Sequence, residues 1–471
     1  MLDGNVVSEE FQVTGLRPTT SVLNYLRSFP GHKGVKEGCA EGDCGACTVV
    51  LGEHQADGSL RYKSVDSCLL FLPMIHGKQL ITVENLKNEN GELHPVQQAM
   101  VDANGSQCGY CTPGFVMSLF SLYKSKDKPT RDEIDDSLTG NLCRCTGYQP
   151  IVKAAAAACV HHGMDRFSKD EARIGAILKT IPSDSLQLQT KEQLYLRPTR
   201  LSEALSLIRL YPQAIVVCGA TDIALRVTKK HEIFKEVIDL SGIGDLKTVV
   251  EKPDALTIGA AVSLTDAMNI LKTEFVALYD MLSVFGSQQI RNVATFGGNL
   301  GTASPIGDTL PVLLAYNARI ILSSSTKRRE VPIDEFIVDY RKTVRRQDEL
   351  ITAIVLPKMS NGAIVKSYKV SKRKDLDIST VSGGFRLTLS DDRVVQNVKL
   401  VYGGMAKITK RAASVEEFLV GKPWKREIVE EAMRLVDSEF SPISDARAGA
   451  EFRSVAARNL LLKFWSETQK S

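Results

Sequence analysis

The hydrophobic and polar positions of the first 90 residues predict a small domain of short strands with one helix. FQVTGL (11–16) and TVVL (48–51) resemble strands, and a further apolar run surrounds residues 68–72. Between them, SVLNYLRSF follows a proline and has the periodicity of an amphipathic helix. A glycine-rich loop separates this helix from TVVL. We therefore expect a β-rich domain over residues 1–90.

Residues 91–162 have a helical pattern instead. HPVQQAMVDAN, PGFVMSLFSLYKS and IVKAAAAACV each repeat apolar positions at helical spacing, and each has a proline where a first helical turn accepts one. Thr130 and Glu133 have the spacing of a capping box, which predicts a further helix start. This part of the chain should be a small helical bundle.

The remainder predicts an α/β region followed by an α+β region. Residues 163–194 are polar without persistent periodicity and fit a linker. Beyond them, the helical LSEALSLIRLY alternates with the strand-like AIVVCG, ALTIGAAV and ARIILSS. Strands GGFRLTLS and VQNVKLVYGG then precede two long helical patterns, EIVEEAMRLVDSEF and EFRSVAARNLLLKFWSET. The expected domains are 1–90, 91–162, 195–360 and 361–471, with the linker at 163–194.

Composition excludes several classes of protein. Charged residues make up 24% of the 471 positions and are interspersed, with a formal net charge of only +4, so neither nucleic acid nor an anionic membrane is an expected partner. No apolar stretch approaches the roughly 20 residues that span a bilayer. The acidic amino terminus, MLDGNVVSEEF, does not have the order of a signal peptide. We therefore expect a cytoplasmic protein.

The distribution of cysteines changes this picture. Nine of the ten cysteines precede position 160, and only Cys218 follows it. Thiols stay reduced in the cytoplasm, so such clustering indicates metal binding rather than disulfides.

The first set of cysteines has the spacing of a plant-type [2Fe-2S] ferredoxin, with four residues, then two, then twenty between successive cysteines. Its members are Cys39, Cys44, Cys47 and Cys68. Gly38, Gly42 and Gly45 would let the loop bend and bring backbone N–H groups close to the sulfurs. A four-cysteine zinc site is the less favoured alternative, because such sites usually present two CxxC pairs. Buried thiols without metal are the other alternative.

The second set is a CxxC pair followed by a CxC pair, at predicted helix starts. Its members are Cys108, Cys111, Cys143 and Cys145. Helix starts offer N–H groups and a positive dipole end, which stabilise thiolates and an anionic cluster. The spacing alone leaves zinc as a fair competitor. Cys159, in an alanine-rich helical pattern, and Cys218 are expected to be packed apolar residues.

Both sets occur within longer motifs: EGCAEGDCGACTVVLGE, HPVQQAM, GSQCGYCTPGF and GNLCRCTGYQPI. In this order they resemble the iron–sulfur portion of the molybdenum hydroxylases, the xanthine dehydrogenase and aldehyde oxidase family. The resemblance implies a second [2Fe-2S] cluster rather than zinc. It continues through VVCGATDIA and QIRNVATFGGNLGTASPIGDTLPVLLA, which are similar to the family's FAD-binding segments. SKRKDLDIS and VYGGMAKITKRA resemble its flavin-domain carboxy-terminal region.

The resemblance implies a multidomain α+β fold. Its parts would be a β-grasp ferredoxin domain, a four-helix [2Fe-2S] domain, a vanillyl-alcohol-oxidase-type FAD domain and an α+β flavoprotein domain. Consistent with a flavin domain that is not of the Rossmann type, no G-x-G-x-x-G opens a helix after a predicted strand. The chain ends where single-chain members continue into a molybdopterin domain. It therefore resembles the small subunit of the bacterial two-subunit xanthine dehydrogenases, with a large molybdopterin-binding subunit as partner in an (αβ)2 heterotetramer.

A flavin dinucleotide needs exposed N–H groups at close approach, which small residues permit. Gly-rich turns at 219–221, 297–299 and 301–304 offer them, although such turns are weak signals alone. By position in the family, the FAD contacts would be Val216, Val217, Cys218, Gly219, Ala220, Thr221, Asp222, Phe285, Thr295, Phe296, Gly297, Gly298, Asn299, Ser304, Asp308, Ile351 and Lys369. The family usually has two glycines where this chain has Gly219-Ala220 after Cys218, and this departure keeps the residues of the turn small.

Four of these residues have individual expected roles. Phe285 would pack on the adenine, Asp308 would accept a hydrogen bond from the ribose or a nearby hydroxyl, and Ile351 and Lys369 would lie beside the cofactor. Ordinary core packing is the alternative for Phe285 and Ile351, and a solvated strand position is the alternative for Lys369.

The implied function is electron transfer. Family members hydroxylate a purine carbon at molybdenum, converting hypoxanthine to xanthine and urate. This chain would take electrons from the partner's molybdenum cofactor through the second cysteine set, with Gln107 at the molybdopterin. The first set and FAD would pass them to NAD+ as co-substrate. The alternatives are the equivalent subunit of an aldehyde or N-heterocycle hydroxylase, and a non-catalytic electron-carrier module.

Overall fold

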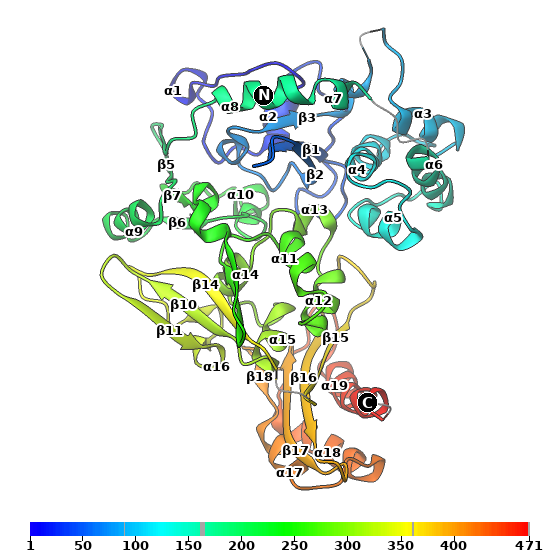
Figure 1. The fold of residues 1–471 in the computed structure, drawn as a ribbon, viewed down its shortest axis with the longest axis vertical. Helices are drawn as coiled ribbons and strands as arrows, with labels where there is room; N and C mark the ends of the chain where they lie inside the picture. Colours follow the sequence, from blue (N-terminus) through cyan, green and yellow to red (C-terminus); the bar gives the residue numbers. More distant parts are fainter. Residues whose placement is uncertain (89, 161–164, 360–361, 470–471) are drawn as a thin grey trace. The chain divides into compact units, whose positions relative to one another are not determined.

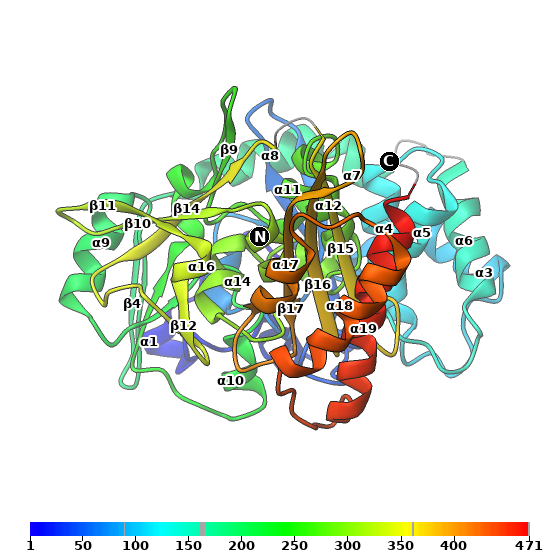
Figure 2. The same cartoon turned by 90° about the horizontal axis from the view of Figure 1, so that it is seen from below.

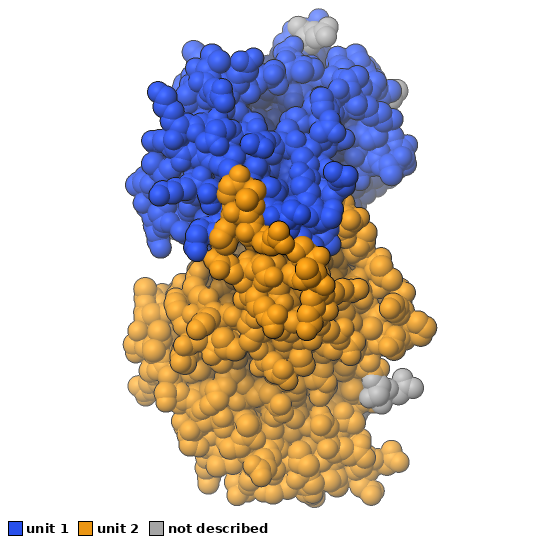
Figure 3. All heavy atoms as spheres, turned by 90° about the vertical axis from the view of Figure 1, so that its left-hand side faces the viewer, with its two compact units in different colours: residues 1–207, 213–243, 287–294 blue, residues 208–212, 244–286, 295–471 orange. Residues whose placement is uncertain are grey.

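The computed structural model describes residues 1–88, 90–160, 165–359 and 362–469 (Figure 1). The chain divides into two compact units, which Figure 3 draws in different colours. Unit 1 comprises Met1–Leu207, Gln213–Ile243 and Ser287–Ala294. Unit 2 comprises Ile208–Pro212, Gly244–Gly286 and Thr295–Ser471. The short segment Ser287–Ala294 thus belongs to unit 1, although the residues on both sides of it belong to unit 2.

Unit 1 begins with a three-stranded antiparallel sheet in the order β2-β1-β3. Its elements are α1 (Phe11–Thr14), α2 (Val22–Ser28), β1 (Thr48–His54), β2 (Leu60–Asp66), η1 (Leu72–Ile75), β3 (Gln79–Ile81) and η2 (Val83–Leu86). The strand predicted for FQVTGL was wrong, because this segment forms α1 and buries only Phe11. The helix ends at Gly15, whose φ of 70° is the left-handed conformation that glycine favours.

Four helices follow the sheet, as the periodicity predicted. They are α3 (Pro95–Asp102), α4 (Thr112–Ser125), α5 (Arg131–Leu138) and α6 (Gln149–Val160). The predicted capping box is confirmed, since Thr130 and Glu133 each bond the other's backbone N–H. Phe115, Phe120 and Ile151 lie in the buried core that joins these helices.

The segment expected to be a linker instead carries regular structure. Its described residues include α7 (Arg166–Lys169), α8 (Glu171–Thr180), β4 (Leu186–Gln189) and the start of β5 (Leu194–Arg197), while residues 163–164 lie outside the described ones. Phe167, Ile174 and Leu178 are buried in the same core as the four helices. The segment was predicted as a linker because its few apolar residues are surrounded by polar ones.

Unit 1 also contains a mixed four-stranded sheet in the order β4-β5-β7-β6. Its further elements are α9 (Leu201–Leu210, which ends in unit 2), β6 (Ile215–Val217), α10 (Ala224–Thr228), β7 (Glu236–Asp239), η3 (Leu240–Gly242) and α13 (Gln288–Arg291). Strands β5, β7 and β6 run parallel, so their carboxyl ends share one edge of the sheet.

Unit 2 contains a five-stranded antiparallel sheet in the order β11-β10-β14-β9-β8 and a four-stranded antiparallel sheet in the order β15-β16-β17-β18. The strands are β8 (Val249–Glu251), β9 (Ala255–Gly259), β10 (Arg319–Ser323), β11 (Arg328–Pro332), β12 (Ile337–Asp339), β13 (Lys342–Thr343), β14 (Leu350–Pro357), β15 (Ile364–Val370), β16 (Val381–Leu389), β17 (Val395–Gly403) and β18 (Lys410–Arg411). The helices are η4 (Gly244–Lys247), α11 (Leu264–Leu271), α12 (Val276–Ser283), α14 (Phe296–Thr302), α15 (Thr309–Ala315), α16 (Ile333–Phe336), α17 (Ala413–Leu419), α18 (Arg426–Glu439) and α19 (Ala450–Glu467).

The second sheet of unit 2 is covered on both faces. A side chain at Gly384 would overlap the backbone of Pro311 in α15, so the glycine allows α15 to pack closely on that face. The neighbouring Phe385 faces the opposite side and belongs to the core with residues of α17, α18 and α19. Figure 2 shows these three helices beside the sheet. Among the described residues, every helix is too short or too polar to cross a bilayer.

Candidate iron–sulfur and flavin sites

The first cysteine set lies on the loop before β1 and at the end of β2, in unit 1. Its four sulfurs form two pairs. Cys47 Sγ lies 3.3 Å from Cys68 Sγ, and both residues are buried. Cys39 and Cys44 are half-buried and hydrogen-bonded to each other.

The loop of this set has the conformation that the glycines were expected to allow. Gly42 and Gly45 have φ values of 78° and 66°, which few other residues adopt without strain. Cys39 Sγ accepts hydrogen bonds from the backbone N–H groups of Glu41 (3.4 Å) and Asp43 (3.3 Å). The hydrogen bond from Cys44, helped by these N–H groups, lowers the pKa of Cys39 to about 6. The loop therefore stabilises a thiolate, the form that binds iron.

The second set lies at two helix starts of the four-helix part, as predicted. Cys111 is the N-cap residue of α4, and Cys143 and Cys145 precede α6. These sulfurs also form hydrogen-bonded pairs, Cys108 with Cys145 and Cys111 with Cys143. Burial, together with the hydrogen bond to Cys143, raises the pKa of Cys111 to about 12.

In each set the four sulfurs are arranged in two pairs. Within the described parts of the chain, no three His, Cys, Asp or Glu side chains gather so as to hold one metal ion. The four thiolates of each set would hold a [2Fe-2S] cluster, which takes four thiolate ligands.

The two remaining cysteines lie outside these sets. Cys159 is buried in α6, as expected of a packed residue. Cys218 is only half-buried and follows β6.

The first predicted flavin turn lies in unit 1, at the carboxyl end of β6. Val216 and Val217 end the strand, and Ala220 has a φ of 58° before the chain enters α10. A side chain on Gly219 would overlap the carbonyl oxygen of Val293. This glycine is therefore required for packing against residues 293–294, which directly precede the second turn. Thr221 and Asp222 complete the turn and are half-buried.

The second predicted turn opens α14 in unit 2. Thr295 is its N-cap, and its hydroxyl oxygen accepts a hydrogen bond from the N–H of Gly298 at 3.0 Å. Gly297 N–H donates to Ala260 O at 3.0 Å, and a Cβ on this glycine would lie 2.7 Å from that oxygen. Phe296 is buried, and Asn299 Oδ1 accepts from Thr309 at 2.5 Å. Gly297 therefore allows the close approach of this turn to Ala260.

The four residues with individual expected roles all lie in unit 2. Lys369 is not a solvated strand residue, because only 5% of its side chain is exposed and its Nζ lies 2.9 Å from Asp308 Oδ2. Ser379 Oγ donates to the other carboxylate oxygen at 2.5 Å. Ile351 is buried in β14 beside Gly301, and Phe285 is half-buried.

Two predicted contact residues lie in more open positions. Ser304 is half-buried, and its hydroxyl oxygen accepts from the N–H of Ile306 at 3.4 Å. Gln107 is exposed next to the exposed Cys108.

The sequence did not single out Asn141, which lies two residues before Cys143. Its buried amide contacts Gly45 of the first cysteine loop. The only available signal was its place in the GNLCRC motif, where a short polar residue precedes two metal ligands.

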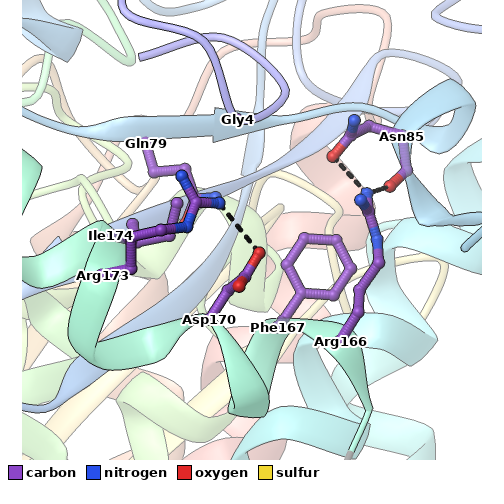
Figure 4. A pocket seen from close by; sticks show the side chains of 8 residues that line it. All are labelled: Gly4, Gln79, Asn85, Arg166, Phe167, Asp170, Arg173 and Ile174. Atoms are coloured by element: carbon purple, nitrogen blue, oxygen red, sulfur yellow. Dashed lines mark hydrogen bonds and ion pairs between the residues drawn. The ribbon is translucent and has the colours of Figure 1, made fainter. Parts of the chain in front are cut away.

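A small pocket lies elsewhere in unit 1, between α7–α8 and residues 4, 79 and 85 (Figure 4). Arg166 bonds Asn85 there, and Arg173 pairs with Asp170 at 2.9 Å. Arg166 Nε and Gln79 Oε1 are buried and have no hydrogen-bond partner among the described residues. An ordered water could satisfy this donor and this acceptor. None of the residues predicted for the cofactor sites is among the residues that line this pocket.

Three family models match separate parts of the chain. Residues 82–156, which contain the second cysteine set, match the [2Fe-2S] binding domain. Residues 187–359 match the FAD binding domain in molybdopterin dehydrogenase, and residues 366–468 match the CO dehydrogenase flavoprotein C-terminal domain. The chain has the iron–sulfur and FAD-binding domains of a molybdenum hydroxylase. It is therefore an oxidoreductase module for electron transfer within that family.

Curated relatives of this molybdenum hydroxylase module are xanthine dehydrogenases. The xanthine dehydrogenase/oxidase of Gallus gallus is 31% identical over 95% of the chain, and the xanthine dehydrogenase of Emericella nidulans is 32% identical over 96%. The chain spans only 38% and 37% of the length of these two relatives.

Solved structures share the fold of more than half of the chain. A chain of the carbon monoxide dehydrogenase of Hydrogenophaga pseudoflava superposes with a TM-score of 0.55 at 22% identity, covering 57% of this chain and 94% of that one. A chain of quinoline 2-oxidoreductase from Pseudomonas putida 86 gives a TM-score of 0.54 at 20% identity, covering 58% and 95%.

Proposed function

We propose that this chain is the electron-transfer subunit of a xanthine dehydrogenase of purine catabolism. It would act in the cytoplasm with a separate large subunit that carries the molybdenum cofactor, in an (αβ)2 heterotetramer. The observation that carries the proposal is the presence of two cysteine sets, each arranged as two sulfur pairs, on a chain that also has the family's FAD-binding domain. The xanthine dehydrogenase relatives, at about 31% identity, favour a purine substrate over an aldehyde or another N-heterocycle.

The domain plan supports this assignment. The β1–β3 sheet with α2 would be a β-grasp ferredoxin domain over residues 1–90, and α3–α6 the four-helix cluster domain over 91–162. Residues 195–360 would form the vanillyl-alcohol-oxidase-type flavin domain, and 361–471 the α+β domain that completes the flavoprotein.

Exposure of the cysteines supports the order of electron carriers. Cys108 and Cys145 are exposed, and Tyr110, Leu142 and Tyr148 add exposed apolar surface around them. Such a patch beside a redox site fits a protein interface. The second set, with Gln107, would therefore face the molybdenum subunit. The first set, whose Cys47 and Cys68 are buried, would pass electrons onward to the flavin.

Two short turns of the chain, residues 216–222 and 295–299, are the expected FAD contacts. Each turn has small residues, which suit close approach of a pyrophosphate or a ribityl chain. The buried ion pair between Lys369 and Asp308 would hold β15 against the start of α15, near the second turn. The flavin, when bound, supplies the conversion between single-electron and hydride transfer that NAD+ requires.

The experiment that tests this proposal uses the complex co-purified with its large subunit. Cys145→Ala should abolish xanthine-dependent NAD+ reduction but spare NADH-dependent dye reduction at the flavin. Cys159→Ala is the matched control, since this thiol is packed in α6 and both activities should persist. Loss of both activities in Cys145→Ala, or of neither, would contradict the proposed order.

A further inference from the structure

A single buried amide joins the two cysteine sets of unit 1. Asn141 is 5% exposed, and its side chain uses its full hydrogen-bonding capacity of two donors and two acceptors. Its Nδ2 donates to Gly45 O at 3.1 Å and to Thr48 Oγ1 at 3.2 Å. Its Oδ1 accepts from Ser118 Oγ at 2.6 Å and from Gln289 Nε2 at 3.0 Å.

The four partners of Asn141 come from three functional segments. Gly45 lies between Cys44 and Cys47 of the first set, and Thr48 begins the strand that follows them. Ser118 lies on α4, the helix that Cys111 caps. Gln289 lies on α13, within the segment Ser287–Ala294 that directly precedes the second flavin turn. One side chain therefore bonds to the first cluster loop, to the helix that Cys111 caps and to the chain leading to the flavin motif.

The backbone beside Asn141 adds a direct link between the sets. The N–H of Leu142 donates to the carbonyl oxygen of Cys44 at 3.0 Å. The acceptor, Cys44, is a member of the first set, and the donor, Leu142, directly precedes Cys143 of the second set. One backbone hydrogen bond therefore links the two sets.

Three glycines let these segments approach so closely. A Cβ on Gly45 would overlap Gly140 O and Asn141 Nδ2, and one on Gly114 would overlap Gly45 O. A Cβ on Gly140 would overlap Gln289 Oε1. Because backbone meets backbone at this junction, small displacements of either loop would break its hydrogen bonds or create overlaps.

We propose that Asn141 is a positioning residue that fixes the first cysteine set relative to the second and thereby sets the electronic coupling between the two clusters. The inference rests on the proposed function, because it requires a cluster in each set. Asn141 has no sulfur contact among its hydrogen bonds, so it acts through Gly45 and Leu142 rather than as a ligand. An alanine would leave Gly45 and Gln289 without the central amide that holds them together.

The test is low-temperature electron paramagnetic resonance of the full chain, reduced with dithionite, together with iron analysis. Two reduced clusters held close together split each other's signals by spin–spin interaction. Asn141→Ala should keep its iron but lose or change this splitting. His94→Gln is the matched control, because His94 is a buried polar residue of the same helical part whose side chain bonds Asp165. This control should lower the melting temperature and leave the splitting as in the native chain.

The outcomes separate the two proposals. An unchanged splitting in an Asn141→Ala chain with full iron would overturn the positioning role, as would two native cluster signals that show no splitting. If Asn141→Ala does not fold or loses iron, Gln289→Leu replaces it, since this change removes one donor to Asn141 and should alter the splitting in the same direction. An unchanged splitting in Gln289→Leu would then overturn the role. A native chain without two cluster signals would instead refute the proposed function.

Discussion

The ion pair between Lys369 and Asp308 allows a quantitative test of what these two predicted flavin residues do. Only 5% and 8% of their side chains are exposed, and the charges lie 2.9 Å apart. Lys369 Nζ also donates to Val284 O at 2.9 Å, and Ser379 donates to Asp308. The pair thus belongs to a buried hydrogen-bond network within unit 2.

Asp308→Ala would leave the ammonium group of Lys369 buried without its counter-charge. Removing one partner of a buried pair costs about 3–5 kcal/mol in free energy of unfolding. For domains of about 150–250 residues, 1 kcal/mol shifts the melting temperature by about 2–4 °C. The expected decrease in the melting temperature of unit 2 is therefore about 6–20 °C.

The assay is differential scanning calorimetry of the chain stripped of FAD, so that loss of a flavin contact cannot contribute. Glu430→Ala is the matched control. Its ion pair with Arg426 has nearly the same length, 2.7 Å, but the side chains are 46% and 60% exposed. Such pairs contribute about 0.5 kcal/mol, so this change should shift the melting temperature by about 2 °C or less.

A double variant checks the physical reason. Replacing both charges with apolar side chains, as in Asp308→Leu with Lys369→Met, removes the unpaired charge and should recover part of the lost stability. If Asp308→Ala shifts the melting temperature no more than Glu430→Ala, the buried pair does not stabilise unit 2 and the reasoning fails.

Two further predictions concern the four-helix part. Gly114→Ala should push α4 away from Gly45, at a cost of about 1–3 kcal/mol, and the melting temperature should fall; equal stability would show that the junction can relax. Burial favours the protonated form of Asp165, but the hydrogen bond from His94 and the charge of Lys124 outweigh it, and its pKa lies below the usual value. The resulting stability is complete above about pH 4, the unfolded-state pKa, and is lost as the pH falls through the folded-state pKa. The free energy of unfolding of the native chain, measured with urea, should therefore decrease as the pH falls below about 4. Asp165→Asn should reduce this pH dependence. An unchanged pH dependence in the variant would contradict the assignment.

Local sequence signals were sufficient for much of the fold. The periodicity of 112–125 predicted α4, and the spacing of Thr130 and Glu133 predicted a capped helix, because both depend on residues within a few positions of each other. The same holds within each group of neighbouring cysteines, namely Cys39–Cys47, Cys108–Cys111 and Cys143–Cys145. The prediction for FQVTGL was wrong because its apolar residues fit either a strand or a helix. The segment forms a short helix that ends at Gly15.

The sequence by itself therefore predicted the two cysteine sets as metal sites, and it determined which helices surround the second set. Only the tertiary structure decided that Lys369 is buried, that 166–180 packs into the helical core, and that Ser287–Ala294 belongs to unit 1. It also decided the role of Asn141, whose partners lie as far as 148 positions away. Burial and hydrogen bonding between distant segments depend on which surfaces the folded chain brings together, and no local pattern records that choice.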